Sequence, residues 1–538
     1  GERVRETPDA LGVIPLSPRL FPAQREYTLD YAFADIPLLQ MRVDEEDIEE
    51  WLEEQLSDIR EARIMVPIWH EGMHAHADPK GILEFYLARE GVLESREVLR
   101  GFDLLTFSLK ADPQFTTVGS RDTVGQSFSN LDLVDARWGV GYPNPDSSGE
   151  TAAAGTPVWA ILTWQLKYPS PDLKVTLDLV DDAGHRLDSS EVPLLNAENL
   201  PTSQWPAGTI GRSYHMIMVP STQPPGSVWL ESRVYDANTL IAVQPDSGSL
   251  HGGVPIGRVS ISPALQPQSD DVLSVARPVQ ARLPSGVTLI GLDPWPEEIS
   301  PGQDLILRLY WQAEVPLHST QFYTILLDGT DVSAAVRLPL NLPVGQPIHT
   351  YADLKLPPDV PTGSYHLVLD SHDGASSVKL GQISVAGRSR EFEVPRLQTC
   401  LDVTFGDLVA LLGMDVAGDL HVTPGQSMKV NLIWRVLDTP GLDLVRFTHL
   451  VGSDEQPLAQ QDTVACSGTC PASTWLLGEI LRDEVSMVIP DDLAPGSYSL
   501  VVGWYDAATA SRLPAQDADG RRLQDDVFPL PLKVVVGP

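Results

Sequence analysis

The stretch His-Glu-Gly-Met-His at 70–74 is where residue types and spacing in this sequence match a catalytic pattern. In such HExxH motifs, two histidines one helical turn apart bind zinc, and the glutamate activates a water molecule. That geometry requires the middle of a helix, whereas Pro67 and Pro79 flank this stretch closely. We therefore predict a loop between a strand and a helix, with a zinc protease kept as an alternative.

Three histidines of this loop, His70, His74 and His76, are the candidate metal ligands of the chain. We expect either adventitious metal binding by them or a solvated loop. No nucleophile elbow, P-loop or dinucleotide-binding glycine pattern is present, and the Asp-rich turn at 517–520 falls short of a calcium loop. The sequence thus predicts no cofactor and offers no catalytic site, and whether the chain is part of a longer enzyme stays open.

Acidic residues dominate the charged composition: 73 Asp and Glu against 37 Lys and Arg give a net charge of −36. This balance argues against binding to a nucleic-acid backbone or to anionic lipid headgroups, both of which need a positive surface. No apolar run reaches the roughly 18–20 residues of a transmembrane helix. We therefore expect neither a nucleic-acid partner nor a membrane-spanning segment in this chain.

The three cysteines are Cys400, Cys466 and Cys470, and they form no CxxC pair, so a structural zinc site is not expected. Cys466 and Cys470 lie in the Ser/Gly/Thr-rich segment ACSGTCP. In an oxidising compartment we predict a small loop disulfide between them, and two unpaired thiols otherwise. Cys400 is then left over, and we expect it to be a buried, small apolar residue.

Three copies of one pattern run from about residue 128 to the C-terminus. In each copy a turn glycine precedes an alternating strand and a tryptophan, as follows: Gly155 and Trp164, Gly302 and Trp311, Gly425 and Trp434. A later Pro/Thr-Gly turn feeds a second strand that ends near an aspartate: Asp236, Asp373 and Asp506. Short strands with almost no helical periodicity are typical of an immunoglobulin or fibronectin-type sandwich, so we place the repeated tryptophans in the cores.

Two further tryptophans, Trp205 and Trp475, lie in polar segments, TSQWPAG and ASTWLLG, that the middle copy lacks. We consider them candidate binding residues that offer an exposed aromatic contact to a glycan or a partner. In that interpretation sandwiches one and three carry the ligand-facing loop, and sandwich two is a spacer. The alternative is that each tryptophan packs against the end of its own sandwich.

The N-terminal part has a different pattern. Apolar periodicity and an acidic first turn predict a helix over 44–59, and Asp78 and Gly91 predict the start and stop of a helix over 78–91. Strands are expected at 62–69 and 102–110.

The predicted fold class is mainly β: a small N-terminal α/β domain followed by three tandem Ig/fibronectin-like β-sandwiches. The predicted parts are an extended leader (1–23), the α/β domain (24–118) and sandwiches at 119–265, 266–388 and 389–538.

The repeated motifs PGQ…LxLxW, W…G and PGSYxLxxGxYD resemble the extracytoplasmic C-terminal region of bacterial polytopic membrane glycosyltransferases of the dolichyl-phosphate-mannose mannosyltransferase type. DPKGILEFYLAREG with LRGFDLLTFSL is similar to the small α/β domain after the last membrane helix of that family. The resemblance covers about 24–538, and the middle sandwich departs from it, with His372 in place of Tyr235 and Tyr505. It implies lipid-linked sugar donors and a catalytic carboxylate in a loop that this sequence does not contain, so no catalytic residue is carried over.

We predict a non-catalytic extracytoplasmic region, at the cell surface or secreted, of a glycosyltransferase-like membrane protein, which binds or positions a glycan, an acceptor or a protein partner. The chain begins at Gly1 rather than Met, and we expect a preceding region to attach it to the membrane. The alternative is a secreted structural protein of the cell surface, a subunit of a surface layer, sheath or filament. The reading frame upstream of Gly1 separates the two.

Overall fold

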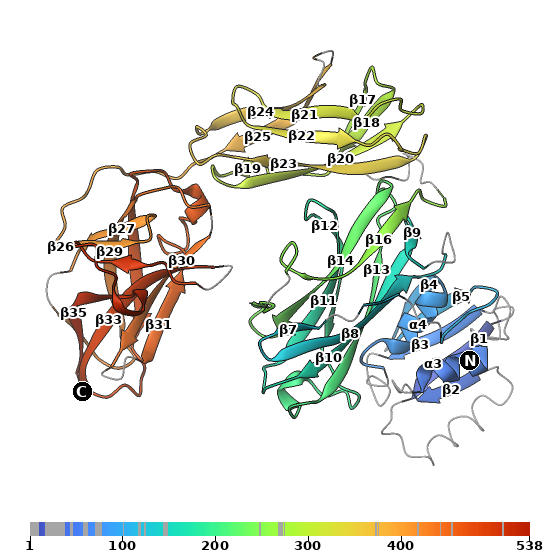
Figure 1. The fold of residues 1–538 in the computed structure, drawn as a ribbon, viewed down its shortest axis with the longest axis horizontal. Helices are drawn as coiled ribbons and strands as arrows, with labels where there is room; N and C mark the ends of the chain where they lie inside the picture. Colours follow the sequence, from blue (N-terminus) through green and yellow to red (C-terminus); the bar gives the residue numbers. More distant parts are fainter. Residues whose placement is uncertain are drawn as a thin grey trace. The chain divides into compact units, whose positions relative to one another are not determined.

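The computed structural model (Figure 1) describes residues 10–16, 38–42, 47–56, 63–69, 78–100, 102–116, 120–122, 125–143, 149–246, 249–266, 273, 275–371, 374, 376–416, 419–441, 443–452, 456–507 and 511–537. The chain divides into two compact units, one over 1–291, 309–321 and 338–350, the other over 292–308, 322–337 and 351–538. The fold is mainly β, as predicted, with an α/β part followed along the chain by β-sandwiches. Among the helices of the described ranges, none has the length and apolar character needed to span a membrane.

The N-terminal part is a five-stranded sheet of order β2-β1-β3-β5-β4. Its elements are β1 (Ala10–Leu16), β2 (Leu38–Arg42), α3 (Ile48–Leu56), β3 (Arg63–Trp69), α4 (Ile82–Glu90), β4 (Gly91–Leu99) and β5 (Phe102–Leu109). Strand β1 pairs in parallel with both β2 and β3 and buries Val13 completely. The prediction of an extended leader over 1–23 is therefore wrong for 10–16, where the apolar segment ALGVIPL supplies a sheet strand.

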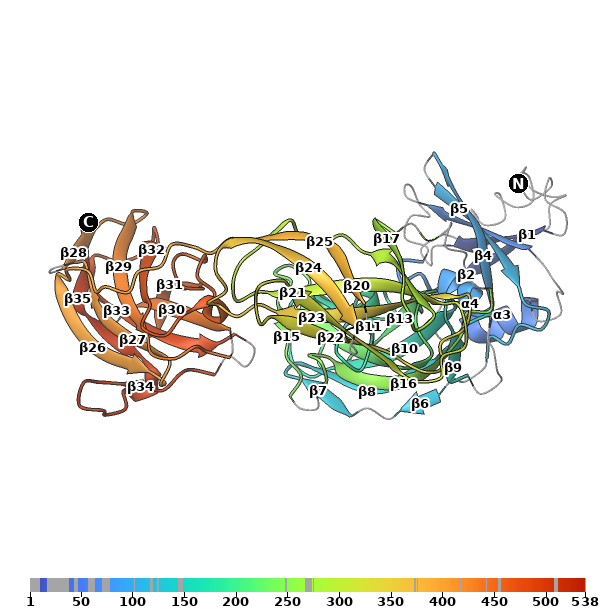
Figure 2. The same cartoon turned by 90° about the horizontal axis from the view of Figure 1, so that it is seen from above.

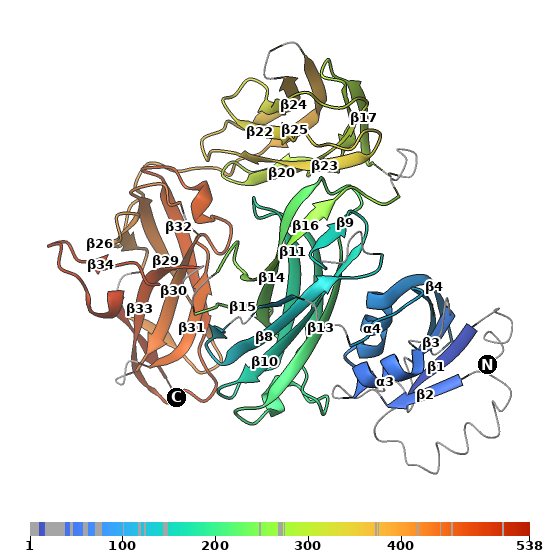
Figure 3. The same ribbon diagram turned by 45° about the vertical axis from the view of Figure 1, so that its right-hand side comes forward.

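Helices α3 and α4 contribute their apolar faces to one core with strands β1, β3 and β5 (Figure 3). Helix α4 begins at Ile82, later than predicted, because the backbone first makes a turn in which Gly81 donates to the Asp78 carbonyl and adopts φ +66°. Asp78 still caps the helix, since its carboxylate accepts the backbone N–H groups of Ile82 and Leu83 at 2.8 Å each. Burial raises the pKa of this carboxyl to about 6.

Sandwich 1 consists of two facing sheets (Figure 1). The first has the order β13-β10-β8-β6, with β7 also pairing β8; the second has the order β12-β11-β14-β16-β9, with β15 pairing β14. The strands are β6 (Ser120–Asp122), β7 (Gln126–Phe128), β8 (Leu131–Val140), β9 (Thr151–Ala153), β10 (Pro157–Leu166), β11 (Leu173–Val180), β12 (Arg186–Pro193), β13 (Ile210–Met218), β14 (Gly226–Asp236), β15 (Ala242–Val243) and β16 (Val254–Ser262), with a 3-10 turn η1 (Thr202–Gln204).

Sandwich 2 has sheets of order β17-β18-β20-β23 and β19-β25-β24-β21-β22. Its strands are β17 (Arg277–Arg282), β18 (Val287–Leu292), β19 (Glu298–Ile299), β20 (Asp304–Ala313), β21 (Gln321–Leu327), β22 (Ser333–Leu338), β23 (Pro347–Lys355), β24 (Gly363–Ser371) and β25 (Ser377–Val385).

Sandwich 3 repeats the plan with sheets of order β32-β29-β27-β26-β34 and β28-β35-β33-β30-β31 (Figure 2). Its elements are β26 (Thr399–Phe405), β27 (Val409–Met414), β28 (Leu420–Val422), β29 (Ser427–Val436), β30 (Leu444–Val451), β31 (Pro457–Thr463), η2 (Ala472–Thr474), β32 (Ile480–Val488), β33 (Gly496–Asp506), β34 (Ala515–Gln516), η3 (Gln524–Asp526) and β35 (Phe528–Val536).

The repeated tryptophans Trp164, Trp311 and Trp434 are fully buried, which confirms their predicted place in the sandwich cores. Each lies near the end of its strand. Strands β20 and β29 begin with alternating buried and exposed residues, whereas β10 is buried on both faces, because Trp159 and Ile161 pack into the core of the α/β part.

The α/β part and sandwich 1 share a core. Phe85 and Tyr86 of α4 form edge-to-face contacts with Tyr214 of β13, and Phe85 also contacts Trp159 of β10. The Arg89 guanidinium lies 5.2 Å from the Trp159 ring centroid. Helix α4 is therefore buried on two sides, by its own sheet and by the outer face of the first sheet of sandwich 1.

Candidate functional site

The predicted metal ligands His70, His74 and His76 lie outside the described residues. Within the described part of the chain, no group of three or more His, Cys, Asp or Glu side chains is arranged to hold a metal ion.

Trp205 and Trp475 are buried, with exposed fractions of 5% and 0%. Both follow a 3-10 turn and donate their indole N–H to the backbone carbonyl five residues earlier, Leu200 at 2.7 Å and Cys470 at 2.9 Å. The Trp205 ring also covers Gly211 so closely that a Cβ there would lie 2.2 Å from the ring. The prediction of exposed aromatic contacts is therefore wrong, because the polar neighbours cap the end of each sandwich while the rings fill its core.

Cys466 and Cys470 form a disulfide in the structure, with Cα atoms 5.4 Å apart. The bond closes the loop that precedes η2, and the Cys470 carbonyl is the one that accepts the Trp475 N–H. Cys400 is a free, exposed thiol on β26, so the prediction that it is buried is wrong.

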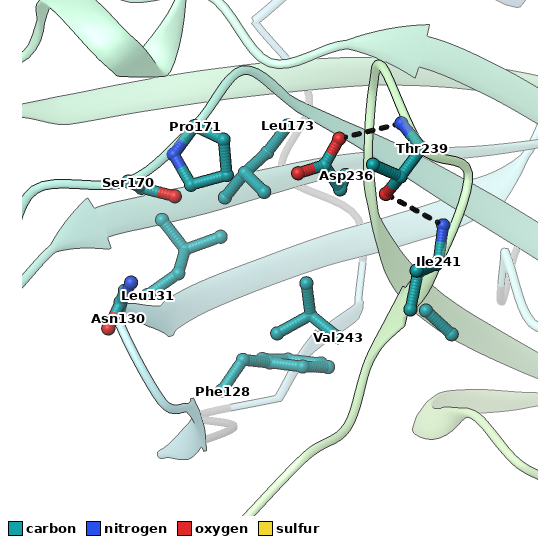
Figure 4. Close-up of a pocket in the computed structure, with 11 residues that line it drawn as sticks. Phe128, Asn130, Leu131, Ser170, Pro171, Leu173, Asp236, Thr239, Ile241 and Val243 are labelled. Carbon is teal, nitrogen blue, oxygen red and sulfur yellow. Dashed lines mark hydrogen bonds between the residues drawn. The ribbon is translucent and has the colours of Figure 1, made fainter. Parts of the chain in front are cut away.

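A pocket of about 340 Å³ opens at one end of sandwich 1 (Figure 4). Three chain segments meet there, and their lining residues are Phe128, Asn130, Leu131, Ser170, Pro171, Leu173, Asp236, Thr239, Ile241, Ala242 and Val243. Phe128, Leu131 and Leu173 belong to the buried core. The pocket is therefore an opening into the apolar interior of the sandwich rather than a polar cleft.

The strand ends position these side chains. Strand β7 ends at Phe128 and β8 begins at Leu131, while Leu173 opens β11 directly opposite Asp236, the last residue of β14. The chain then turns back into β15, with Ala242 and Val243 paired to β14. The pocket thus lies where both sheets end, in the loop region that sandwich domains use for recognition.

Asp236 organises the turn between β14 and β15. Its Oδ1 accepts the backbone N–H groups of Asn238 at 2.8 Å and Thr239 at 2.9 Å, and its own N–H donates to the Ile241 carbonyl at 3.0 Å. The Thr239 hydroxyl in turn accepts the Ile241 N–H at 3.4 Å (Figure 4). The donated backbone hydrogen bonds, that of Thr239 foremost, hold the pKa of Asp236 below its usual value, so the carboxylate is ionised at neutral pH.

This turn presents two large apolar side chains to solvent: Leu240 is 63% exposed and Ile241 67%. Leu240 also has a left-handed backbone, with φ +58°, which costs a side-chain-bearing residue about 1–2 kcal/mol. In the sequence, the signal for this site is the apolar pair Leu240 and Ile241 in a turn that also contains Asp, Asn and Thr. The structure adds the exposure of the pair and the open apolar pocket beside it.

Further carboxylates belong to residues next to the segments that line the pocket. Asp172 lies between the lining residues Pro171 and Leu173, and its Oδ1 accepts the Ser203 N–H at 3.2 Å. Exposed Asp246 accepts at 3.0 Å the N–H of Ser129, which lies between the lining residues Phe128 and Asn130.

Lys167 is a cation close to these carboxylates. Its ammonium group lies 3.0 Å from Asp132 and 4.0 Å from Asp246. Together with Asp172 and Asp236, these carboxylates give the rim an excess of negative charge.

A cluster of charged residues on the outer face of the sheet β12-β11-β14-β16-β9 has a structural role. Glu231 and Asp178 are fully buried; Glu231 contacts His251 Nδ1 at 2.7 Å, and Asp178 forms an ion pair with Arg233. Arg233 also donates to the His251 carbonyl at 2.9 Å. Burial raises the pKa of Glu231, and these contacts fix the segment around His251 onto β14.

No family model matches the sequence, and no curated protein matches it. Several solved structures show a loose likeness. The C-terminal domain of wzt aligns with 27% of this chain and 79% of its own, at 10% identity and a TM-score of 0.18. A D1–D4 ectodomain fragment of ICAM-5 aligns with 83% of this chain and 91% of its own, at 10% identity and a TM-score of 0.17.

A bacterial adhesin from Mobiluncus mulieris aligns with 48% of this chain and 100% of its own, at 8% identity and a TM-score of 0.16. Such low scores carry no conclusion about function. The assignment of tandem sandwiches rests on the sheets themselves.

Proposed function

We propose that this chain is an extracytoplasmic recognition region that uses the open end of sandwich 1 to bind or position a partner. The observation that carries the proposal is the pocket of about 340 Å³, which lies in the size range of binding pockets, about 300–1,000 Å³. Its walls are mainly aliphatic, and Asp236, its charged member, already accepts two backbone N–H groups of its own turn. These features favour binding over chemistry at this site.

The disulfide between Cys466 and Cys470 supports an extracytoplasmic location of the chain. Disulfides persist in secreted and cell-surface proteins and are rare where thiol-reducing systems operate. We therefore propose that the chain works outside the cytoplasm, at the cell surface or in secreted form.

Exposed Cys400 provides the test of this location. In cells or spheroplasts that express the natural gene, a membrane-impermeant maleimide should label Cys400 without lysis, and the label on the peptide that contains residue 400 should disappear in a Cys400→Ser variant. Labelling only after lysis would contradict the proposal.

We further propose that the chain belongs to a glycosyltransferase-like membrane protein. The support is the sequence resemblance in the repeated strand motifs and in the α/β segment. A run of membrane-spanning helices encoded upstream of Gly1 is the expected finding; a signal peptide alone would favour the secreted structural protein instead.

A further inference from the structure

We propose that the sandwich-1 pocket receives one large aliphatic or aromatic side chain from a cationic protein segment, in which Lys or Arg flanks that residue. This inference rests on the proposed function and names the partner chemistry of the same site. The recognition element is the pocket together with Leu240, Ile241 and the carboxylate rim.

The pocket accounts for the preference for a large apolar side chain. Its floor consists of Phe128, Leu131 and Leu173, which are 1%, 0% and 4% exposed, so an entering group meets the sandwich core rather than water. Burying a large apolar side chain in such a setting contributes the anchor energy of many protein interfaces.

The turn explains why a protein segment fits better than a free small molecule. Leu240 and Ile241 extend the apolar surface beyond the pocket mouth, and a partner backbone lying across the mouth can cover them while its side chain fills the pocket. Leu240 retains its left-handed conformation in spite of its side chain, whereas the hairpin that follows β24 in sandwich 2 has Gly374 at φ +70°. An exposed apolar residue in a costly conformation is the arrangement expected where contact, not folding, requires the side chain.

The charges near the pocket account for the preference for a cationic segment. Asp236 lines the pocket, Asp172 lies between the lining residues Pro171 and Leu173, and Asp246 accepts the N–H of Ser129, while Lys167 lies toward Asp132 and Asp246. Complementary charge at a rim speeds association and selects partners by sign. A Lys or Arg next to the inserted side chain therefore meets an excess of negative charge near the pocket.

The same charges disfavour other occupants. A second copy of this chain carries a net charge of −36, and an anionic lipid surface repels the rim in the same way. A glycan requires several directed hydrogen bonds, whereas Asp236 and Thr239 are engaged in their own turn.

The experiment uses the full chain with methyl-labelled Leu, Ile and Val and three synthetic peptides. The probe is acetyl-Gly-Lys-Phe-Lys-Gly-amide; the matched peptides replace both Lys by Glu, or Phe by Ser. Titration followed by NMR should shift the methyl signals of Leu240, Ile241 and Val243 with the Lys-Phe-Lys peptide, while each matched peptide should bind at least about tenfold more weakly.

Variants then locate the binding. Ala242→Trp fills the mouth and Ile241→Ser removes half of the apolar tip; each should weaken the Lys-Phe-Lys peptide at least about fivefold. Leu477→Ser is the matched control, because Leu477 has the same exposed fraction of 67% on sandwich 3, and it should leave binding unchanged. The melting temperatures of all three variants should stay close to that of the parent.

A charge variant completes the design. Asp172→Asn with Asp246→Asn keeps the acceptor oxygens for Ser203 and Ser129 but removes two charges. It should weaken the Lys-Phe-Lys peptide severalfold and flatten its dependence on salt. Equal binding of the Glu and Lys peptides, full binding of the Ser peptide, or no binding up to the solubility limit would overturn the proposal.

Sodium decanoate serves as the probe for an acyl ligand. If it shifts the same methyl signals while the Lys-Phe-Lys peptide does not, the pocket binds acyl chains and the proposal fails. Because Cys400 labelling does not involve this pocket, failure of the peptide test leaves the proposed location intact, and failure of the labelling leaves the peptide test intact.

Discussion

Sandwiches 1 and 3 bury tryptophans at the same positions, here called the aromatic frame, but differ in the polar residues of their cores. Trp164 and Trp434 occupy equivalent strand positions and are fully buried, and Trp205 and Trp475 close the same end of each domain. The position of Trp164 and Trp434 follows from strand register: Trp164 pairs with Gly211 of β13 and Trp434 with Leu481 of β32, and both lie at the same distance from the turn that precedes their strand.

The polar contents of the two cores differ. In sandwich 1, Ser213 accepts the Trp164 indole N–H at 3.0 Å. At the matching position of sandwich 3, Asp483 instead accepts a hydrogen bond from buried Arg446 at 2.6 Å, and the Trp434 N–H finds no acceptor among the described residues. The shared strand register therefore determines which positions face the core, while the residues at those positions determine the polarity of each core.

The largest expected effect comes from breaking the buried pair of sandwich 3. Asp483→Ser installs the residue of sandwich 1 but leaves the Arg446 guanidinium buried without its carboxylate. We expect a loss of about 3–5 kcal/mol in the stability of sandwich 3. Hydrogen exchange measured on peptides from β29 to β33 reports this loss within the intact chain.

The control for this variant is the double exchange Asp483→Ser with Arg446→Val, which reproduces Ser213 and Val175 of sandwich 1 in sandwich 3. Removing both charges restores most of the lost stability, because no buried charge is left unpaired. A double variant as unstable as the single one would show that the two interiors are not interchangeable.

Trp475→Ala tests the aromatic frame itself. Trp475 forms edge-to-face contacts with Trp504, with ring centroids 5.5 Å apart, and its removal should cost about 3–5 kcal/mol. Trp205 has Val234 instead of a tryptophan at the position of Trp504, so we expect Trp205→Ala to cost less. Denaturant unfolding followed by tryptophan fluorescence measures both, and equal losses would contradict the comparison.

The core tryptophans were predictable because a glycine turn and a fixed distance to the next tryptophan specify one strand register, and Trp164, Trp311 and Trp434 are all buried as expected. Trp205 and Trp475 were not, because polar sequence neighbours describe the backbone of a turn and not the direction of its aromatic ring. The burial of the pair Arg446 and Asp483 could not be predicted either, because in the sequence each resembles an exposed strand residue.

The pocket depends on tertiary pairing that no local pattern specifies. The register that places Leu173 opposite Asp236 brings the turn after β14 next to Phe128. The local part of this site was visible in the sequence: an aspartate ends the strand, and Leu240 and Ile241 follow it in a polar turn. Their partners across the pocket belong to other strands, and only the folded chain brings them together.

His215 makes the stability of sandwich 1 depend on pH. It is fully buried in sandwich 1, its Nε2 lies 3.0 Å from Ser213 Oγ, and burial lowers its pKa to about 4 from 6.5. Since the folded-state pKa is depressed, the unfolded chain binds the proton first, and stability is lost as the pH falls from about 6.5 towards 4. The loss reaches about 3 kcal/mol at the acidic end of this window.

Sandwich 3 has Val485, also fully buried, at the position of His215. We therefore expect His215→Val to flatten the loss of melting temperature of sandwich 1 between pH 6.5 and 4. Exposed His421 supplies the control, and His421→Val should retain the parent profile. An unchanged slope in His215→Val would show that other groups dominate acid unfolding.

The loops before Trp205 and Trp475 are held by different interactions. In sandwich 3 the disulfide between Cys466 and Cys470 closes the loop. In sandwich 1 the Asn196 side chain accepts the backbone N–H groups of Glu198 and Leu200. Replacing both cysteines by Ser should cost about 2 kcal/mol, given the short loop that the bond closes.

Asn196→Ala should cost less, about 1 kcal/mol, because a turn hydrogen bond contributes less than a covalent closure. Thermal unfolding under non-reducing conditions measures both changes. A reducing agent provides the internal control. It should lower the stability of sandwich 3 in the parent and in the Asn196 variant to that of the cysteine variant, and it should leave the loss that Asn196→Ala causes in sandwich 1 unchanged.

The smallest expected effect concerns the tip of the sandwich-1 pocket. Leu240→Gly removes the side chain that makes φ +58° costly, and this gain is offset in part by the greater freedom of glycine in the unfolded chain. We expect stability to change by less than about 1 kcal/mol, in the stabilising direction. Binding of the Lys-Phe-Lys peptide should weaken in the same variant, because Leu240 offers its apolar surface to the partner and not to the core. A core residue shows the opposite behaviour, as Trp475→Ala should. Parallel measurement of melting temperature and peptide affinity separates the two roles, and a large fall in melting temperature for Leu240→Gly would place Leu240 among the residues that hold the fold.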